Sequence, residues 1–535
     1  MSQVTGGYAS HHPPSSIASL RGVFAGHLKG LPLDLSSGLR YSLPPRVCER
    51  PSGVRRRPKK QQKSTNKLTE QNPSSRTPKG PEQGTDIVKN TSFKIAAAAA
   101  AVASLFASAA NAGGFQLTEQ SALGLGRAYA GAGVDGADVS GVYYNPASMT
   151  LTPGTAAQLG FVGVGLNLDY ADNSGTTENG RKAPELIPHA FISHQVNDTT
   201  WVGFSFTVPF GMATEYDRNW AHKDHGTDAE IMVFDFNPSV AWKVTDKVRL
   251  GAGISLQYVD ASLGMGGTAP TDASLTKTTN VHGQLEATST AWGWNAGILF
   301  MPVENVRLGI SYRSQIQHKA EGDLTIDGLA PFALNENVAL PLDKFNGTYD
   351  SGAVVSAPAW AMMSAAWDVN SWLSLYATFR WTDWSSFESL KVDTTALEGA
   401  IAGSGSVPPL AQGVVGQMVE GMSYIRNNWR DTYLYSVGGD LRVNSFWTLR
   451  GGIAYETSPI QERETRTAII PDADRWWFSV GSTFHWTKDF QTDVGFSHLH
   501  GVHERSLYDK ETGKELGKFR KLDAYLLGVQ AQYRF

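Results

Sequence analysis

The segment VRLGAGISLQYV, residues 248–259, alternates between apolar and small or polar side chains, and this alternation decides the class of fold. Its even-numbered positions are Val, Leu, Ala, Ile, Leu and Tyr, whereas its first five odd-numbered positions are Arg, Gly, Gly, Ser and Gln. Successive side chains of a β-strand point to opposite faces, so a period of two predicts a strand with one apolar face. Residues 202–208, 306–313 and 524–535 repeat the pattern.

Two architectures give such strands: a soluble β-sandwich with a buried apolar face, or a transmembrane barrel whose apolar face meets lipid. The connections distinguish them, because tight polar turns alternate strictly with long loops, as in outer-membrane barrels. We therefore predict an all-β fold, a 14-stranded antiparallel transmembrane β-barrel. The predicted strands lie near residues 154–170, 184–196, 200–215, 229–243, 247–262, 284–302, 305–321, 350–368, 372–390, 424–443, 446–460, 472–487, 490–505 and 518–535.

The N-terminal part has a different composition. Residues 1–112 carry 16 Lys and Arg against 5 Asp and Glu, whereas the remainder carries 30 against 45. Residues 1–87 are rich in Pro, Ser, Lys and Arg and show no periodicity, which predicts a disordered basic extension. The alternative is a translation start that has been assigned too early. We expect no binding of nucleic acid.

Residues 88–112 have the three parts of a secretory signal peptide. Lys89 and Lys94 form a positive region, Ile95 to Ala110 an apolar stretch, and Ala110 to Ala112 an A-x-A cleavage site. Cleavage there would leave residues 113–535, which contain no cysteine because the single cysteine is Cys48. The predicted location is the outer membrane of a Gram-negative bacterium.

Residues 113–153 precede the first strand and do not alternate. They are rich in Gly and Ala, and we predict a mostly helical hatch, or plug, inside a barrel formed by residues 154–535. The most specific motifs in this region and beyond are GGFQLTEQSALGLGRAYAG (113–131), NPASM (145–149), PFG (209–211), PDADRWWFSVG (471–481) and YLLGVQAQYRF (525–535). They resemble motifs of the FadL family of outer-membrane transporters.

The resemblance implies transport of long-chain fatty acids or, in some members, aromatic hydrocarbons. It also implies roles for individual residues. Gly114 and Phe115 would contribute to a ligand-binding site, and Asn145, Pro146 and Ala147 would belong to the part of the hatch that faces the lumen. Pro209, Phe210 and Gly211 would mark a lateral opening in the third strand, since proline cannot donate to a β-ladder.

Two long loops are unusually apolar. Leu324, Phe332 and Leu334 of loop 322–349, with Val414 and Met418 of loop 391–423, are the candidate capture groove for cargo. The alternative is that these side chains only pack the loops onto one another.

Arginines are the candidate anchors for a fatty-acid carboxylate, because a buried carboxylate needs a charged partner. The candidates are Arg426 and Arg430 beside the longest loop, and Arg249, Arg313 and Arg380 on lumen-facing positions. Each could instead pair with Asp or Glu for structural reasons, and an aromatic hydrocarbon would need none of them.

The predicted function is outer-membrane transport of hydrophobic compounds by passive diffusion, with long-chain fatty acids as the first cargo class and aromatic hydrocarbons as the alternative. We expect no enzymatic activity, cofactor or metal, and interpret the histidines of HKDHGTD (222–228) and HLHGVH (498–503) as solvated. Less favoured alternatives are a general porin and a lipid hydrolase; Ser497 and His498 fall on opposite faces of a strand. Expected partners are outer-membrane lipids, lipopolysaccharide and the barrel-assembly machinery, through the strand ending at Phe535, with a monomeric protein.

Overall fold

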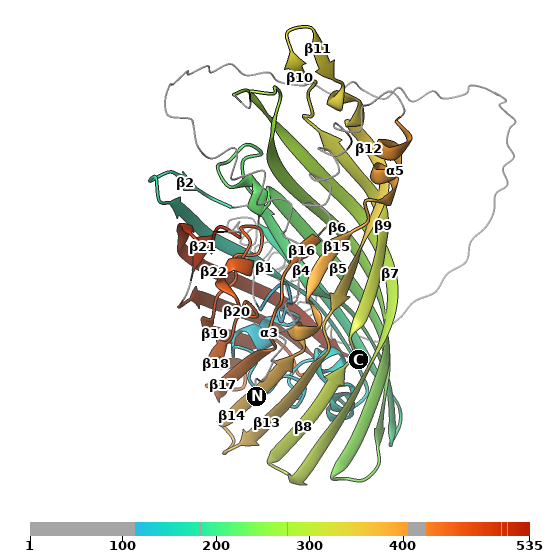
Figure 1. The fold of residues 1–535 in the computed structure, drawn as a ribbon. Coiled ribbons are helices and arrows are strands. Elements are labelled where there is room, and N and C mark those ends of the chain that lie inside the picture. The colour runs from blue at the N-terminus through green and yellow to red at the C-terminus, as the bar shows by residue number, and fades with distance from the viewer. Residues whose placement is uncertain are drawn as a thin grey trace, which may run out of the picture. The chain divides into compact units, whose positions relative to one another are not determined.

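The computed structural model describes residues 113–180, 184–274, 276–404, 412, 424–503, 505–510 and 512–535. Their main element is a closed antiparallel β-barrel of 14 strands, as predicted (Figure 1). The barrel closes where the first strand pairs with the last, from Ala156 opposite Arg534 to Asp172 opposite Gly517. Among the described residues, no helix is long and apolar enough to cross a membrane.

Four of the wall strands are interrupted and carry two labels each. The wall consists of β1 (Thr155–Asp172), β3 (Glu185–Asn197), β4 (Thr200–Glu215), β5 (Asp228–Lys243), β6 (Val248–Pro270), β7 (Thr278–Val303), β8 (Val306–Arg313) continued by β9 (Ile316–Asp327), β12 (Gly347–Ala357) continued by β13 (Trp360–Asp368), β14 (Leu373–Thr382) continued by β15 (Ser389–Val392), β16 (Tyr424–Arg426) continued by β17 (Thr432–Arg442), β18 (Trp447–Glu456), β19 (Arg475–His485), β20 (Phe490–Gly501) and β22 (Glu515–Arg534).

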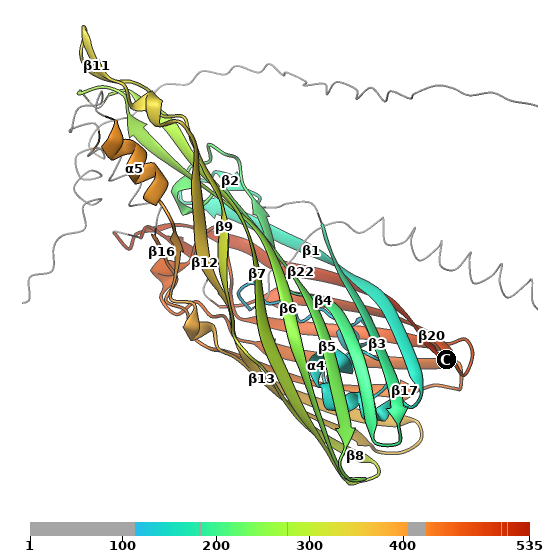
Figure 2. The same ribbon diagram turned by 90° about the vertical axis from the view of Figure 1, so that its right-hand side faces the viewer.

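The long loops contain short elements of their own. These are β2 (Thr177–Glu178), η2 (Lys223–His225), β10 (Phe332–Asn335), β11 (Val338–Leu340), η3 (Leu342–Phe345), η4 (Trp384–Ser386), α5 (Thr395–Gly403), η5 (Arg463–Thr465) and β21 (Ser506–Tyr508). β6, β7, β9 and β12 rise beyond the other strands at the end that carries β10, β11 and α5 (Figures 1 and 2).

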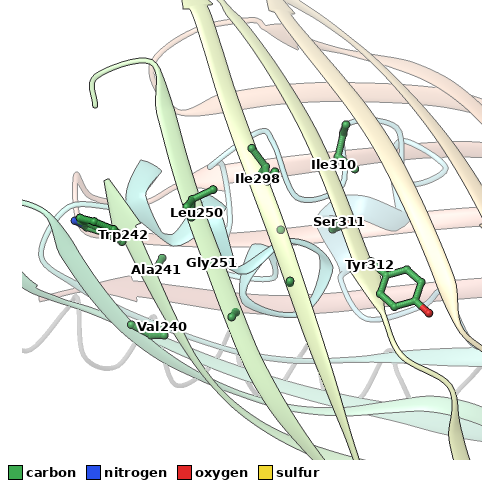
Figure 3. Close-up of a pocket in the computed structure, with 12 residues that line it drawn as sticks. Val240, Ala241, Trp242, Leu250, Gly251, Ile298, Ile310, Ser311 and Tyr312 are labelled. Atoms are coloured by element: carbon green, nitrogen blue, oxygen red, sulfur yellow. The ribbon is translucent and has the colours of Figure 1, made fainter. Parts of the chain in front are cut away.

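Apolar side chains cover the outside of the wall. In β6, Leu250, Ile254 and Tyr258 are exposed, whereas Ser255 and Gln257 are fully buried on the inner face. Such a wall is stable only in lipid, where closure also satisfies every backbone group. A groove on this outer wall lies between Trp242, Leu250, Ile298 and Tyr312, with small residues such as Gly251 at its floor (Figure 3).

The ends of several strands differ from the prediction. β6 continues to Pro270 and β7 begins at Thr278, although the predicted segments were 247–262 and 284–302. These extensions are rich in Gly and Thr and contain few large apolar side chains, Leu263, Met265 and Val281, so their sequence shows little of the lipid-facing alternation. β12 and β13 are separated at Pro358, a residue that cannot donate to the ladder.

The hatch lies inside the barrel and contains three short helices: α3 (Ala122–Leu125), α4 (Gly141–Tyr144) and η1 (Pro146–Leu151) (Figure 2). The rest of residues 113–153 forms turns and extended segments, so the hatch is less helical than predicted. Its charged groups reach the wall: Arg127 pairs with Asp440 of β17 at 3.1 Å and also with Asp135 of the hatch. Asp138 accepts a hydrogen bond from Gln530 of β22 at 3.2 Å.

Glycines on the inner face of the wall make room for the hatch. A Cβ added to Gly251 of β6 would collide with the Ala147 amide, and one added to Gly452 of β18 would collide with the Arg127 carbonyl. The same holds for other glycines that face the hatch around the barrel: Gly203, Gly297, Gly309, Gly481, Gly495 and Gly528. The hatch backbone therefore approaches the wall more closely than any other residue type would allow.

Candidate functional site

The barrel wall is interrupted between β3 and β4. Their pairing runs from Asn197 opposite Thr200 to Ala190 opposite Phe206 and stops there. The remaining part of β3, Glu185 to His189, pairs with β1 only, while β4 continues alongside β5 to Glu215. Among the described residues, no strand of the wall pairs with the edge of β4 that faces β3 from residue 207 onward.

The hatch supplies the missing partner. The Leu117 amide donates to the Pro209 carbonyl at 2.8 Å, and the Gly211 amide donates to the Phe115 carbonyl at 2.9 Å. The Gln120 side chain donates to the Val208 carbonyl at 2.7 Å and accepts from the Val208 amide at 3.1 Å. Buried backbone groups need such partners, so residues 115–120 of the hatch close the edge that β3 leaves open.

Pro209, Phe210 and Gly211, the predicted lateral opening, lie at this interruption. The β4–β5 register shifts between Thr207 and Phe210, which places a bulge at Pro209. The Pro209 carbonyl points toward the hatch. The N–H and C=O groups of a strand residue point to the same edge of the strand, so an N–H group at residue 209 would point there too. Proline therefore removes a donor from the edge that faces β3.

Phe115 is held in an aromatic cluster beside the interruption. Its ring centroid lies 4.7 Å from that of Trp384, 5.6 Å from Phe387, 6.0 Å from Phe210 and 6.2 Å from Trp429. The side chain is 1% exposed.

Gly114 is required by the same cluster. Its φ is +71°, and an added Cβ would lie 2.7 Å from the Trp384 ring and 2.8 Å from the Trp429 ring. Only glycine combines this backbone conformation with so close an approach.

An apolar cavity in the barrel interior begins at the Phe115 ring. The empty space among its lining side chains, part of it open to solvent, amounts to about 760 Å³. Its walls are aliphatic, with Met212, Ile231, Leu285 and Ile469 among them. The few polar lining residues are Ser262, His318, Asn427 and Thr467. Such a lining suits an apolar ligand with at most one polar end.

A second, smaller pocket lies at the interruption itself. It is lined by Leu117 of the hatch, Val164 and Ile187 of β1 and β3, and Val208 and Gly211 of β4. Met212 and Ile231 line both this pocket and the apolar cavity. The first residues of the hatch therefore separate the apolar cavity from a mostly apolar pocket that Glu185 and Glu230 also line.

A network of buried charges holds the first residues of the hatch. Asp472 accepts from the Gly114 amide at 2.9 Å and pairs with Arg475 at 3.4 Å. Arg475 pairs with Glu456 at 3.1 Å, and Glu456 pairs with Arg380 at 2.8 Å. Arg380 in turn donates to the Thr118 hydroxyl at 2.7 Å, so the network contacts the hatch at both ends.

Glu119, in the hatch and outside the membrane-spanning strands, is buried next to this network. Burial, followed by the nearby negative charge of Glu456, raises the pKa of Glu119 to about 7. Its Oε2 atom is buried and accepts no hydrogen bond from any described residue. The carboxyl group thus changes its protonation near neutral pH at the base of the segment that fills the interruption.

The five predicted carboxylate anchors all have protein partners. Arg313 pairs with Asp235 at 2.7 Å, Arg249 donates to the Thr150 carbonyl at 3.1 Å, and Arg380 belongs to the network above. Arg426 pairs with Glu462 at 3.1 Å, and Arg430 lies 3.9 Å from Asp474. None of the five lines the apolar cavity, although Arg426 lies between two residues that do, Ile425 and Asn427.

Asn145, Pro146 and Ala147 lie against the wall and do not line the apolar cavity. The Asn145 side chain accepts from the Ala147 amide at 3.1 Å and donates to the Ile298 carbonyl of β7 at 3.1 Å. All three residues are buried, facing the inner glycines of β6 and β7. The structure therefore places them at a contact between hatch and wall inside the barrel.

Apolar side chains in part of the predicted capture groove are buried. Leu324 belongs to β9 and is 4% exposed, packed in a cluster with Leu285 and Phe345. Phe332 packs against the same cluster, and only Leu334 is exposed. Val414 and Met418 lie outside the described residues.

The sequence analysis missed the residues that hold the hatch segment: Glu456, Asp472, Arg475, Trp384 and Gln120. One of the motifs that carry the resemblance, PDADRWWFSVG (471–481), includes two of these charged residues, Asp472 and Arg475. A signal was available, because charged residues next to membrane-facing aromatic residues are costly unless they pair.

An apolar outer wall, a closed 14-stranded barrel and an internal hatch define the protein as a hatch-containing β-barrel of the Gram-negative outer membrane. The chain belongs to the family described as outer membrane protein transport protein (OMPP1/FadL/TodX), whose model matches residues 103–535.

Relatives of known name span nearly the whole chain. A long-chain fatty acid transport protein of Escherichia coli O6:H1 (strain CFT073) is 29% identical over 471 residues, which cover 84% of this chain and all of the relative. A 47 kDa outer membrane protein of Pasteurella multocida is also 29% identical, with the same coverage of both chains.

Solved structures share the fold. A Pseudomonas aeruginosa FadL homologue has a TM-score of 0.63 at 23% identity, covering 79% of this chain and all of that one. The Pseudomonas putida toluene transporter TodX has a TM-score of 0.56 at 17% identity, covering 74% of this chain and 94% of that one.

Proposed function

We propose that the protein carries hydrophobic compounds across the outer membrane by passive diffusion, with long-chain fatty acids as the main cargo. The observation that carries this proposal is that Phe115, at the start of hatch segment 115–120, lines the apolar cavity, while this segment fills the interruption between β3 and β4. Cargo enters the cavity from the long-loop end, displaces this segment and leaves sideways into the membrane. Relatives named long-chain fatty acid transport protein support the cargo class.

The physical reason for this path is the insolubility of the cargo. Burial of each methylene is favourable by about 0.8 kcal/mol, so an alkyl chain moves readily from one apolar surface to the next. An aqueous channel would not stabilise an alkyl chain. Lateral exit lets the chain pass from the cavity to the lipid core without crossing water.

The carboxylate end of a fatty acid needs a partner at the mouth of the cavity. Arg426 is the best-placed of the five arginines, because it is largely exposed and its two neighbours in sequence line the cavity. Its partner Glu462 lies at the surface, where exchange of one carboxylate for another costs little. Arg430 is the second candidate. We infer that Arg249, Arg313 and Arg380 serve the fold and the hatch.

Aromatic hydrocarbons remain the second cargo class. Solved relatives of the same fold include toluene transporters, and the cavity lining has few polar groups that a hydrocarbon would leave unpaired. A hydrocarbon would use the same two apolar spaces and would not depend on Arg426.

The two other functions considered from the sequence have less support. A general porin needs a water-filled lumen, whereas the hatch packs directly against the inner glycines of the wall. A lipid hydrolase needs a nucleophile beside a base, but Ser497 is buried against Ser479 on the inner face, while His498 stacks on Tyr525 on the outer face. We propose that the protein catalyses no reaction.

Reconstitution into phospholipid vesicles tests the proposal against its alternatives. We expect uptake of a long-chain fatty acid that exceeds uptake by protein-free vesicles, without swelling in small sugars and without release of fatty acid from the phospholipid. Swelling in sugars would favour a porin, and release of fatty acid would favour a hydrolase. Either result, without fatty-acid uptake, would overturn the proposal.

We further infer that the mature chain begins at Gly113, after export and cleavage. N-terminal sequencing of protein purified from outer membranes tests this. The exposed end of the last strand, Phe535 at 78% exposure, fits recognition by the barrel-assembly machinery. We also propose that lipopolysaccharide surrounds the barrel and that the protein is a monomer.

A further inference from the structure

Two histidines and an aspartate converge on the outer wall near the long-loop end of the barrel. His498 and His500 lie on β20 two positions apart, so both point to the same face. β22 places Asp523 directly opposite His500 and Tyr525 opposite His498. Phe496 and Tyr525 are exposed on this face, which is the outer one.

The ligand atoms of the three residues lie close together. The His500 Nδ1 atom is 2.6 Å from the Asp523 Oδ1 atom, and the His498 Nε2 atom is 3.9 Å from the same oxygen. One ligand atom from each residue fits within a mutual separation of 4.8 Å. The His498 ring stacks on Tyr525 with centroids 4.7 Å apart and planes at 6°, which fixes its orientation.

These separations are near those that a small divalent ion requires. Bonds of roughly 2.0–2.1 Å to imidazole nitrogen and carboxylate oxygen put tetrahedral ligands about 3.3 Å apart. A small rotation of the side chains from the positions above reaches that spacing. Two imidazoles and one carboxylate also suit zinc and its neighbours among the transition metals, and not the oxygen-seeking Mg²⁺ or Ca²⁺.

The strand register identifies a third ligand that the sequence does not show. From the motif HLHGVH alone we expected solvated histidines, because the third histidine breaks any regular ligand spacing. In the structure His503 turns away and contacts Asp474 at 3.0 Å. The third ligand is instead Asp523, brought in by the neighbouring strand.

We propose that His498, His500 and Asp523 bind a divalent transition-metal ion of the zinc class on the outer wall of the barrel. The three side chains approach the ion from the protein side. At least one coordination position then remains for water on the outward side. This site is separate from the hatch and the apolar cavity, and the proposal does not depend on the transport function.

Metal binding by the full-length protein, purified in detergent without a histidine tag, tests the proposal. Titration calorimetry with Zn²⁺ and elemental analysis after desalting should show one ion per chain. Co²⁺ should give the intense visible absorption of a four-coordinate site. Absence of a retained Zn²⁺ ion and of this Co²⁺ spectrum in the unaltered protein would overturn the proposal, whatever the variants do.

Variants locate the ion. His498→Ala, His500→Ala and Asp523→Asn should each weaken Zn²⁺ binding by about tenfold or more, since even outer-shell changes cost about that much. His503→Ala is the matched control, because it removes a nearby exposed histidine that also contacts an aspartate. Equal losses in His503→Ala and His500→Ala would contradict the assignment. The mobility shift between unheated and heated samples on gels confirms that each barrel is folded.

Discussion

The backbone amide of Leu117 donates a hydrogen bond to the carbonyl of Pro209 across 2.8 Å, so a residue of the hatch occupies the edge of β4 that β3 has left. This bond couples the hatch to the wall. The hatch segment completes the wall while it stays in place, and its departure would expose an unpaired strand edge. Under the proposed function, opening the exit and moving the hatch would be one event.

Pro209→Val should slow the release of cargo. Valine restores a donor on the edge of β4 that faces β3, and it favours continued pairing where proline prevents it. We expect fatty-acid uptake by reconstituted vesicles to fall several-fold while the barrel stays folded. Pro238→Val is the control, because Pro238 is an exposed proline of the neighbouring strand β5. Uptake unaffected by Pro209→Val would argue against an exit at this position.

Phe115→Ala should weaken cargo binding. A buried aromatic side chain contributes roughly 1.5–3 kcal/mol, which corresponds to a loss in affinity of about one to two orders of magnitude. Displacement of a fluorescent fatty acid from the detergent-solubilised protein measures this. Phe345→Ala, which alters a buried phenylalanine of the loop cluster that does not line the cavity, should leave affinity unchanged. Similar losses of affinity in both variants would show that removing any buried phenylalanine loosens the protein and weakens binding.

Gly251→Ala should displace the hatch from the wall. The added methyl group collides with the backbone of Ala147, and a backbone cannot rotate away as a side chain can. We expect a raised conductance to small ions in planar bilayers. Gly267→Ala in the same strand has no atom within 4 Å of the new methyl group and should behave like the unaltered protein. An unchanged conductance in the Gly251→Ala variant would contradict the close packing described above.

The attachment of the hatch should weaken as pH rises from about 4.5 to about 7. The pKa of Glu119 is raised to about 7 in the folded hatch, above its ordinary value of 4.5, so the folded state binds an extra proton within that window. The stabilisation that protonated Glu119 gives to the attached hatch is complete below pH 4.5 and is lost by pH 7.

Hydrogen exchange of the amides of residues 115–120, corrected for intrinsic rates, measures this change. We expect stronger protection at pH 5 than at pH 8. Glu119→Gln, which is neutral at every pH, should remove the difference. A pH dependence of equal size in the Gln variant would assign the effect to another group.

The transmembrane part of the fold could be predicted because the bilayer imposes a local rule. Each lipid-facing position, such as Ile254, must be apolar whatever its partners are, and its neighbour Ser255 turns inward. Beyond the membrane this rule ends. The extensions of β6 and β7 follow from pairing with each other, which composition alone does not reveal.

The contacts of the hatch could not be predicted for a different reason. Gly114 and Asp472 are separated by 358 positions, and Arg127 and Asp440 by 313. Alternation indicates that a side chain faces the lumen but not which residue lies across it. For that reason Arg380 was recognised as lumen-facing, while its pairing with Glu456 was not.

A disulfide between hatch and wall tests the central claim most directly. Gln116 and Phe210 lie opposite each other in an antiparallel bridge, where Cα atoms are close enough for a disulfide. In a Cys48→Ser background, Gln116→Cys with Phe210→Cys should lock the segment when oxidised. We predict that the oxidised protein takes up no fatty acid and that reduction of the disulfide restores uptake. Equal uptake in the oxidised and reduced states would contradict an exit through this interruption.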